Sequence, residues 1–105
     1  MQATFQNSIE RYRAWMTHRE YSAATMEKYS HALARFFTDS AAQGVTAAGA
    51  DGETAVPAKE AVTAWRDDLV ARGYTPATVN AMLAAVNGYQ ECIGNPEGKA
   101  KPLKR

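Results

Sequence analysis

Several features are scarce in this sequence, and each scarcity excludes a class of protein or site. The single cysteine, Cys92, permits no internal disulfide and no cysteine-based zinc site, and we expect it to be a small buried hydrophobe. The two histidines, His18 and His31, are too few and too far apart to predict a metal site. No apolar run approaches the ~18 residues of a membrane span, and the start, MQATFQNS, does not resemble a signal peptide. We therefore expect a soluble, cytoplasmic protein with no metal, no cofactor and no membrane partner.

Charge of one sign is also scarce, because 12 Lys and Arg residues against 11 Asp and Glu residues leave a net charge of +1. The chain therefore lacks the overall basic character of a strong nucleic-acid binder. Residues 1–35 carry five basic and three acidic side chains, residues 36–68 carry two and six, and residues 69–105 carry five and two. Positive charge gathers toward the two ends of the chain.

The remaining composition is typical of one globular domain. The 105 residues, with 46% apolar and 22% charged side chains, suffice for a single modest core. No segment of useful length alternates with a period of two, so we expect no sheet. Residues 44–56 are small and rich in glycine, and they predict an irregular crossover.

The chain is organised around residues 21–37, YSAATMEKYSHALARFF, and a fainter copy at residues 74–90, YTPATVNAMLAAVNGYQ. In each copy a hydroxyl residue that suits an N-cap, Ser22 or Thr75, precedes a threonine three positions later. Apolar residues then recur at spacings of three and four, which places them on one stripe of a helix. These are Met26, Tyr29, Leu33 and Phe36 in the first copy, and Val79, Met82, Val86 and Tyr89 in the second.

The full pattern predicts an all-α fold, a bundle-like domain of four helices arranged as two helical hairpins. The expected helices cover residues 4–18, residues 23–42, a stretch that opens at Pro57 and closes at Gly73, and residues 76–93. The bulky residues expected in the shared core are Trp15, Phe36, Phe37, Trp65 and Leu83. We expect this domain to span residues 1–96, and residues 97–105, with almost nothing to bury, to form a basic linker.

The order of these motifs resembles the N-terminal, SAM-like core-binding domain of tyrosine recombinases and phage integrases. The resemblance rests on the first copy at residues 22–36, on Gly73 followed by YTPATVNAMLAAVNGY, and on Gly-Asn-Pro followed by a basic stretch. It covers about residues 4–100 and implies a four-helix domain that forms half of a C-shaped clamp around double-stranded DNA. In that family the second and fourth helices lie against the major groove near the strand-exchange site.

The resemblance also implies a partner half, a catalytic domain C-terminal in the parent chain, for which this chain has no room. The sequence offers no convergent cationic set around a tyrosine nucleophile, so we expect no enzyme activity and no catalytic residues in this chain itself. The expected role is binding and positioning of DNA, with self-association on DNA left open.

Phosphate contacts come from basic, hydroxyl and amide side chains and from helix N-termini, and the two copies carry such groups. The candidate DNA-binding residues are Ser22, Thr25, Lys28, His31 and Arg35 in the first copy, Thr75, Thr78, Asn80 and Asn87 in the second, and Lys99 and Lys101 in the tail. Each of these residues also has an ordinary structural interpretation. The hydroxyl residues can be caps and first-turn residues, the basic residues can be solvated surface side chains, and the tail lysines can belong to a linker.

Two functions stay open. The first is the DNA-binding domain of a tyrosine site-specific recombinase or integrase. The second is a helical protein–protein interaction module with no nucleic-acid role, which the near-neutral charge and the Ala-rich helix faces favour. The first requires that the N-terminal ends of the two similar helices lie side by side on one surface.

Overall fold

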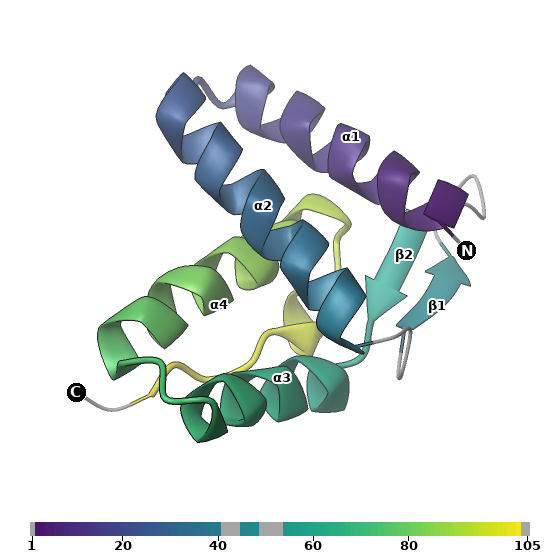
Figure 1. Cartoon of the computed structure of the whole chain (residues 1–105). Coiled ribbons are helices and arrows are strands. Elements are labelled where there is room, and N and C mark those ends of the chain that lie inside the picture. Colours follow the sequence, from purple (N-terminus) through teal and green to yellow (C-terminus); the bar gives the residue numbers. More distant parts are fainter. Residues whose placement is uncertain (1, 41–44, 49–53, 104–105) are drawn as a thin grey trace.

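The computed structural model describes residues 2–40, 45–48 and 54–103 and is mostly helical, as predicted. Four α-helices, a β-hairpin and a short 3-10 helix follow one another along the chain (Figure 1). They are α1 (Gln2–His18), α2 (Ala23–Ser40), β1 (Val45–Ala48), β2 (Thr54–Pro57), α3 (Lys59–Ala71), α4 (Pro76–Cys92) and η1 (Pro96–Gly98). Within these described residues, no helix combines the length and apolar character needed to cross a membrane.

The helices pair as α1 with α2 and α3 with α4, and α2 crosses α4 where the two hairpins meet (Figure 1). A tight turn joins each pair. Glu20 adopts a positive φ of 64° after α1, and Gly73 adopts a φ of 96° after α3. The amide of Tyr74 donates to the carbonyl of Leu69 and the amide of Gly73 to that of Val70, which is the paired bonding of a Schellman motif. The prediction that Gly73 closes the third helix is therefore confirmed.

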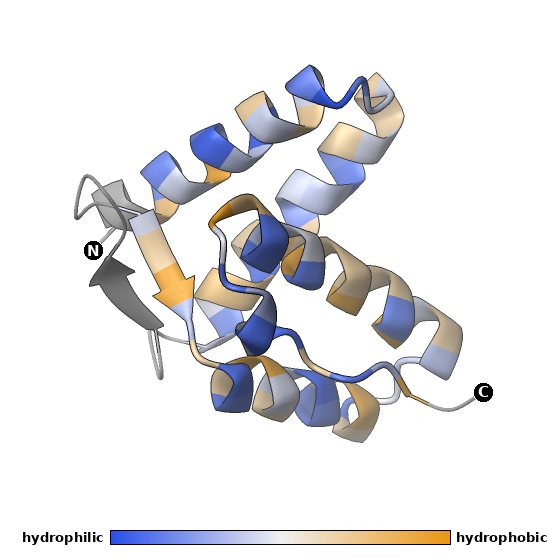
Figure 2. Ribbon diagram, turned by 180° about the vertical axis from the view of Figure 1, so that it is seen from behind, coloured by the Kyte–Doolittle hydropathy of each residue, from blue (hydrophilic) through white to orange (hydrophobic). Residues whose placement is uncertain are grey.

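The core lies between the two hairpins, where the apolar faces of the helices meet (Figure 2). Phe36, Phe37, Trp65 and Leu83 are buried, as predicted. Trp15 is only half-buried, because it packs at the edge of the cluster with Arg19 lying 4.3 Å above its ring. Cys92, expected to be buried, is likewise half-buried.

The expectation of no sheet is wrong, because β1 and β2 pair as an antiparallel hairpin with Val45 opposite Pro57. Except for Pro57, both strands fall within residues 44–56, which were expected to be an irregular crossover. Tertiary contacts stabilise it: the amide of Ala55 donates to Ser8 Oγ at 2.8 Å, and its carbonyl accepts from the hydroxyl of Tyr89. Strands of four residues are too short to show a period, so these distant partners decide the local structure.

The start of the third helix also differs from prediction. Pro57 does not open the third helix but ends β2, where its carbonyl accepts hydrogen bonds from the amides of Gln90 and Asn95. The helix begins instead at Lys59, with Ala58 in an extended conformation before it. The second helix ends at Ser40, and its expected end at residues 42–44 lies outside the described residues.

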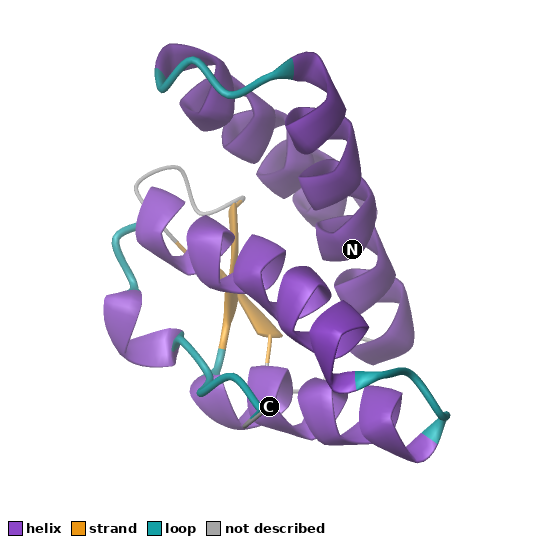
Figure 3. Cartoon of the chain, turned by 90° about the vertical axis from the view of Figure 1, so that its left-hand side faces the viewer, coloured by secondary structure: helices purple, strands orange, loops and turns teal. Residues whose placement is uncertain are grey.

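The tail was expected to bury almost nothing, and this expectation is wrong. Gly98 is buried, Ala100 is 3% exposed and Leu103 packs against the core cluster. The segment turns at η1 and runs back between α3 and α4 toward the start of α4 (Figure 3). Its few apolar atoms are buried because amide side chains on α4 bind its backbone, a contact that composition alone does not reveal.

Candidate nucleic-acid interface

The helices α2 and α4 begin with the same capping arrangement. Ser22 Oγ accepts a hydrogen bond from the amide of Thr25 at 3.1 Å, and Thr75 Oγ1 accepts one from the amide of Thr78 at 3.3 Å. In each pair the two hydroxyl groups are also within hydrogen-bond distance, at 2.9 Å and 3.1 Å. The predicted N-caps are therefore confirmed, as is the predicted place of Pro76 in the first turn of α4.

The helices α2 and α4 line one open groove of about 900 Å³. The residues that line it from α2 are Thr25, Lys28, Tyr29, His31, Ala32 and Arg35, and those from α4 are Ala77, Thr78, Ala81 and Met82. Thr25 and Thr78, in the first turns of the two helices, thus line the same groove, whereas the capping residues Ser22 and Thr75 are not among its lining residues. Of the predicted site residues, the groove brings together Thr25, Lys28, His31, Arg35 and Thr78.

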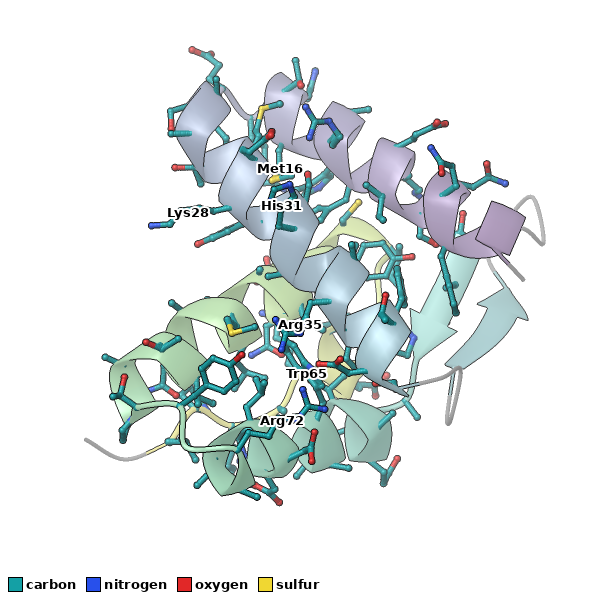
Figure 4. The ribbon with its side chains drawn as sticks, in the orientation of Figure 1. Met16, Lys28, His31, Arg35, Trp65 and Arg72 are labelled. Atoms are coloured by element: carbon teal, nitrogen blue, oxygen red, sulfur yellow. The ribbon has the colours of Figure 1, made fainter. Side chains whose placement is uncertain are left out.

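Three basic side chains follow one another along the groove side of α2. Lys28, His31 and Arg35 are spaced by three and four residues, so they share one helix face. All three are exposed, and Lys28 extends away from the helix into solvent (Figure 4). No acidic residue is among the described residues that line the groove. The groove lining therefore carries the positive charges of Lys28 and Arg35 without an acidic residue, although Asp39 beside the groove pairs with Arg35.

The guanidinium of Arg35 is held by Tyr74, in the turn after α3, and by Asp39, one turn further along α2. Nη2 donates to the hydroxyl of Tyr74 at 3.0 Å, and Nε donates to Asp39 Oδ2 at 3.3 Å. The Tyr74 hydrogen bond, followed by the charge of Asp39, raises the pKa of Arg35 above its ordinary value. Asp39 also accepts from the indole of Trp65 at 3.0 Å and pairs with Arg72 at 3.4 Å (Figure 4). Arg35 thus remains charged, and the hydrogen bonds to Tyr74 and Asp39 fix the orientation of its guanidinium at the end of the groove.

The structure places Asn80 and Asn87 away from these groups. Asn80 makes two hydrogen bonds with the backbone of Leu103, and Asn87 makes two with the backbone of Ala100. Both amides are half-buried and hold the C-terminal segment. In the described part of the chain their polar atoms are thus already engaged, although the sequence favoured them as DNA contacts.

The tail lysines also lie outside the groove lining. Lys99 forms an ion pair with Glu91, which lowers the pKa of that carboxyl. Lys101 is exposed, and its carbonyl accepts a hydrogen bond from Arg66 at 2.7 Å. These residues belong to the docked segment beside α3 and α4.

Sequence reasoning missed two features of this region. The sequence indicates Tyr74 only as the aromatic residue that opens the second copy, yet its hydroxyl orients Arg35. The seven-residue spacing of Asn80 and Asn87 places them on one face of α4. Two amide side chains on a mostly apolar helix indicate that this face binds the backbone of another segment.

The comparisons give no independent indication of function. No family model, no curated protein and no solved structure matches the chain. In the part of the chain that the structure describes, no three His, Cys, Asp or Glu side chains are grouped so that they could hold a metal ion. The groove between α2 and α4 is therefore the feature of the molecule that bears on function.

Proposed function

We propose that this chain is a DNA-binding domain of the tyrosine recombinase or integrase type, with a SAM-like helical fold and a cytoplasmic location. The groove between α2 and α4 is its contact with the sugar–phosphate backbone. In this proposal the domain positions double-stranded DNA, and catalysis belongs to a separate domain of the parent protein. The observation that carries the proposal is the shared groove, which joins Thr25, Lys28, His31 and Arg35 with Thr78 and contains no described acidic residue.

The groups on this surface are those that phosphate contacts use. Helix N-termini offer unpaired amides and partial positive charge, and Lys, Arg and hydroxyl side chains add donors. The small residues Ala77 and Ala81 on the α4 side permit a close approach of a backbone to the helix. Because the net charge is only +1, we expect weak binding by the isolated domain, on the order of micromolar or weaker, with a clear salt dependence.

A fluorescence anisotropy titration with a labelled duplex, at two salt concentrations, tests this proposal. Lys28→Glu should weaken binding at least about fivefold and reduce the salt dependence, because it reverses a charge in the groove. Lys59→Glu is the matched control, since Lys59 is equally an exposed helical lysine but lies at the start of α3 outside the groove. Equal losses from both variants, or no binding at low salt by the folded protein, would contradict the proposal.

A second candidate function follows from the apolar part of the same groove. Tyr29, Ala32 and Met82 line it beside the basic residues, and an amphipathic helix of a protein partner suits such a surface. The double variant Lys28→Glu/Arg35→Glu separates the two functions. Survival of partner binding in this variant, together with no DNA binding by the wild type, would establish the interaction module.

A further inference from the structure

The backbone of residues 99–103, called the strap below, is bound by side chains of α3 and α4. Asn87 Nδ2 donates to the carbonyl of Ala100 at 2.9 Å, and Asn87 Oδ1 accepts from the amide of the same residue at 3.0 Å. Asn80 repeats this arrangement on Leu103, at 3.1 Å and 2.7 Å. Each asparagine therefore satisfies both backbone groups of one strap residue, as a neighbouring strand would.

Two further side chains extend this recognition. Arg66 Nη1 donates to the carbonyl of Lys101 at 2.7 Å, and Gln90 Nε2 donates to the carbonyl of Gly98 at 3.2 Å. The surface formed by Arg66, Asn80, Asn87 and Gln90 is called the amide face below. All of its hydrogen bonds to the strap and to Gly98 are made with backbone atoms.

The spacing of the two asparagines fits a polyproline-II conformation. Seven residues of α-helix rise about 10.5 Å, and three residues of polyproline II rise about 9.3 Å. Because polyproline II has three residues per turn, it turns the backbone groups of residues 100 and 103 to the same side, whereas a β-strand would turn them to opposite sides. Lys99 has φ −68° and ψ 139°, close to ideal polyproline II.

The strap sequence suits this conformation. Pro102 has the required φ and biases Lys101 toward the same region. No described group of the amide face accepts a hydrogen bond from position 102, so a proline there costs no hydrogen bond. Ala100 is 3% exposed and leaves room only for a small side chain, while Leu103 packs on the core cluster.

We propose that the amide face is a binding site for a polyproline-II peptide of the pattern small–x–Pro–apolar, which the chain's own strap fills. The site reads the backbone of the first and fourth residues and selects their side chains by size and polarity. A peptide of the same pattern then binds wherever the strap is displaced. This inference does not depend on DNA binding, since none of these contacts involves a groove residue.

Isothermal titration calorimetry with the acetylated and amidated peptide GKAKPL, the sequence of residues 98–103, tests the proposal. The full-length variant Ala100→Asp should release its strap, because a charged side chain has no room at that position. We expect this variant to bind the peptide at least about tenfold more tightly than the wild type, whose strap competes at millimolar effective concentration. The control peptide GKDKPL should not bind.

The proposal is overturned if folded Ala100→Asp does not bind GKAKPL, or if it binds both peptides equally. Should that variant fail to fold, Leu103→Glu is the milder alternative for the same titration, because Leu103 is only partly buried. Hydrogen exchange of the wild type gives a second check. The amides of Ala100 and Leu103 should be protected relative to the amide of Lys101, and equal exchange at all three would also overturn the proposal.

Discussion

The hydroxyl oxygen of Tyr12 fills the space beside Gly88 that a β-carbon would need. It would lie 2.5 Å from a Cβ added at that glycine, and it donates a hydrogen bond to the carbonyl of Ala85 at 2.7 Å. Tyr12 is fully buried, and burial raises the pKa of its hydroxyl well above the usual range. The close approach of α1 to α4 therefore depends on Gly88, which lies inside α4.

Gly88→Ala should destabilise the protein even though alanine is the better helix former. The gain in helix propensity is about 1 kcal/mol, and forcing the buried Tyr12 ring to move costs about 1–3 kcal/mol. The double variant Tyr12→Phe/Gly88→Ala removes the clashing oxygen, so the alanine should cost less there than in the wild type. Urea denaturation of the four proteins measures this coupling, and strictly additive effects would show that the two residues do not compete for space.

Removing the caps should destabilise each helix start by a similar amount. Ser22→Ala and Thr75→Ala each leave a first-turn amide without its side-chain acceptor, with an expected loss of about 0.5–2 kcal/mol in the free energy of unfolding. Glycine at either position should lower the free energy of unfolding by only about a few tenths of a kcal/mol. Thermal unfolding followed by circular dichroism measures these losses, and an unchanged midpoint in both alanine variants would contradict the capping role.

Tyr74→Phe should weaken DNA binding at only a small cost to the fold. It keeps the ring but removes the hydrogen bond that orients Arg35, so the free energy of unfolding should fall by about 0.5–1.5 kcal/mol and the affinity for DNA by roughly 2–10-fold. Tyr21→Phe is the matched control, because Tyr21 opens the first sequence copy and its hydroxyl makes no described hydrogen bond with Arg35. Anisotropy titrations of both variants give the comparison. An equal effect of the two substitutions would show that the Tyr74 hydroxyl has no specific role in DNA binding.

Gly98→Ala should destabilise the docked strap. An added Cβ would lie 2.6 Å from both Gln90 Nε2 and Asn95 Nδ2, and hydrogen bonds to Pro57 hold these two amides in place. We expect a loss of about 1–3 kcal/mol, measured by urea denaturation.

Gly94→Asn is the control for this substitution. Gly94 has open space around its Cβ position, and asparagine tolerates its positive φ of 73° better than other residues. A loss at Gly94→Asn as large as that at Gly98→Ala would show that contact with the amides is not the cause.

The helices were predictable because their signals are local. The apolar stripes of α2 and α4, their hydroxyl caps and the glycine after α3 each specify a helix or its end within a few residues. Both of these helices line the groove, but the way α2 packs across α4 is a tertiary feature that no local signal specifies.

The β-hairpin and the strap were not predictable because distant partners specify them. Ser8 and Tyr89 bind the backbone of Ala55, and Asn87 binds that of Ala100. Such contacts pair a side chain with a backbone group 13 to 47 residues away, and the bound residues carry no distinctive side chain of their own. A polar residue on a buried helix face is the only local trace they leave.

If the groove between α2 and α4 meets the DNA backbone, an NMR titration of the ¹⁵N-labelled chain with a DNA duplex should show the contact residue by residue. We expect amide shifts that cluster at Thr25, Lys28, Arg35, Thr78 and Ala81 and that diminish at higher salt. Shifts that cluster on the strap or on α1 instead, or no shifts at low salt, would contradict DNA binding at the groove.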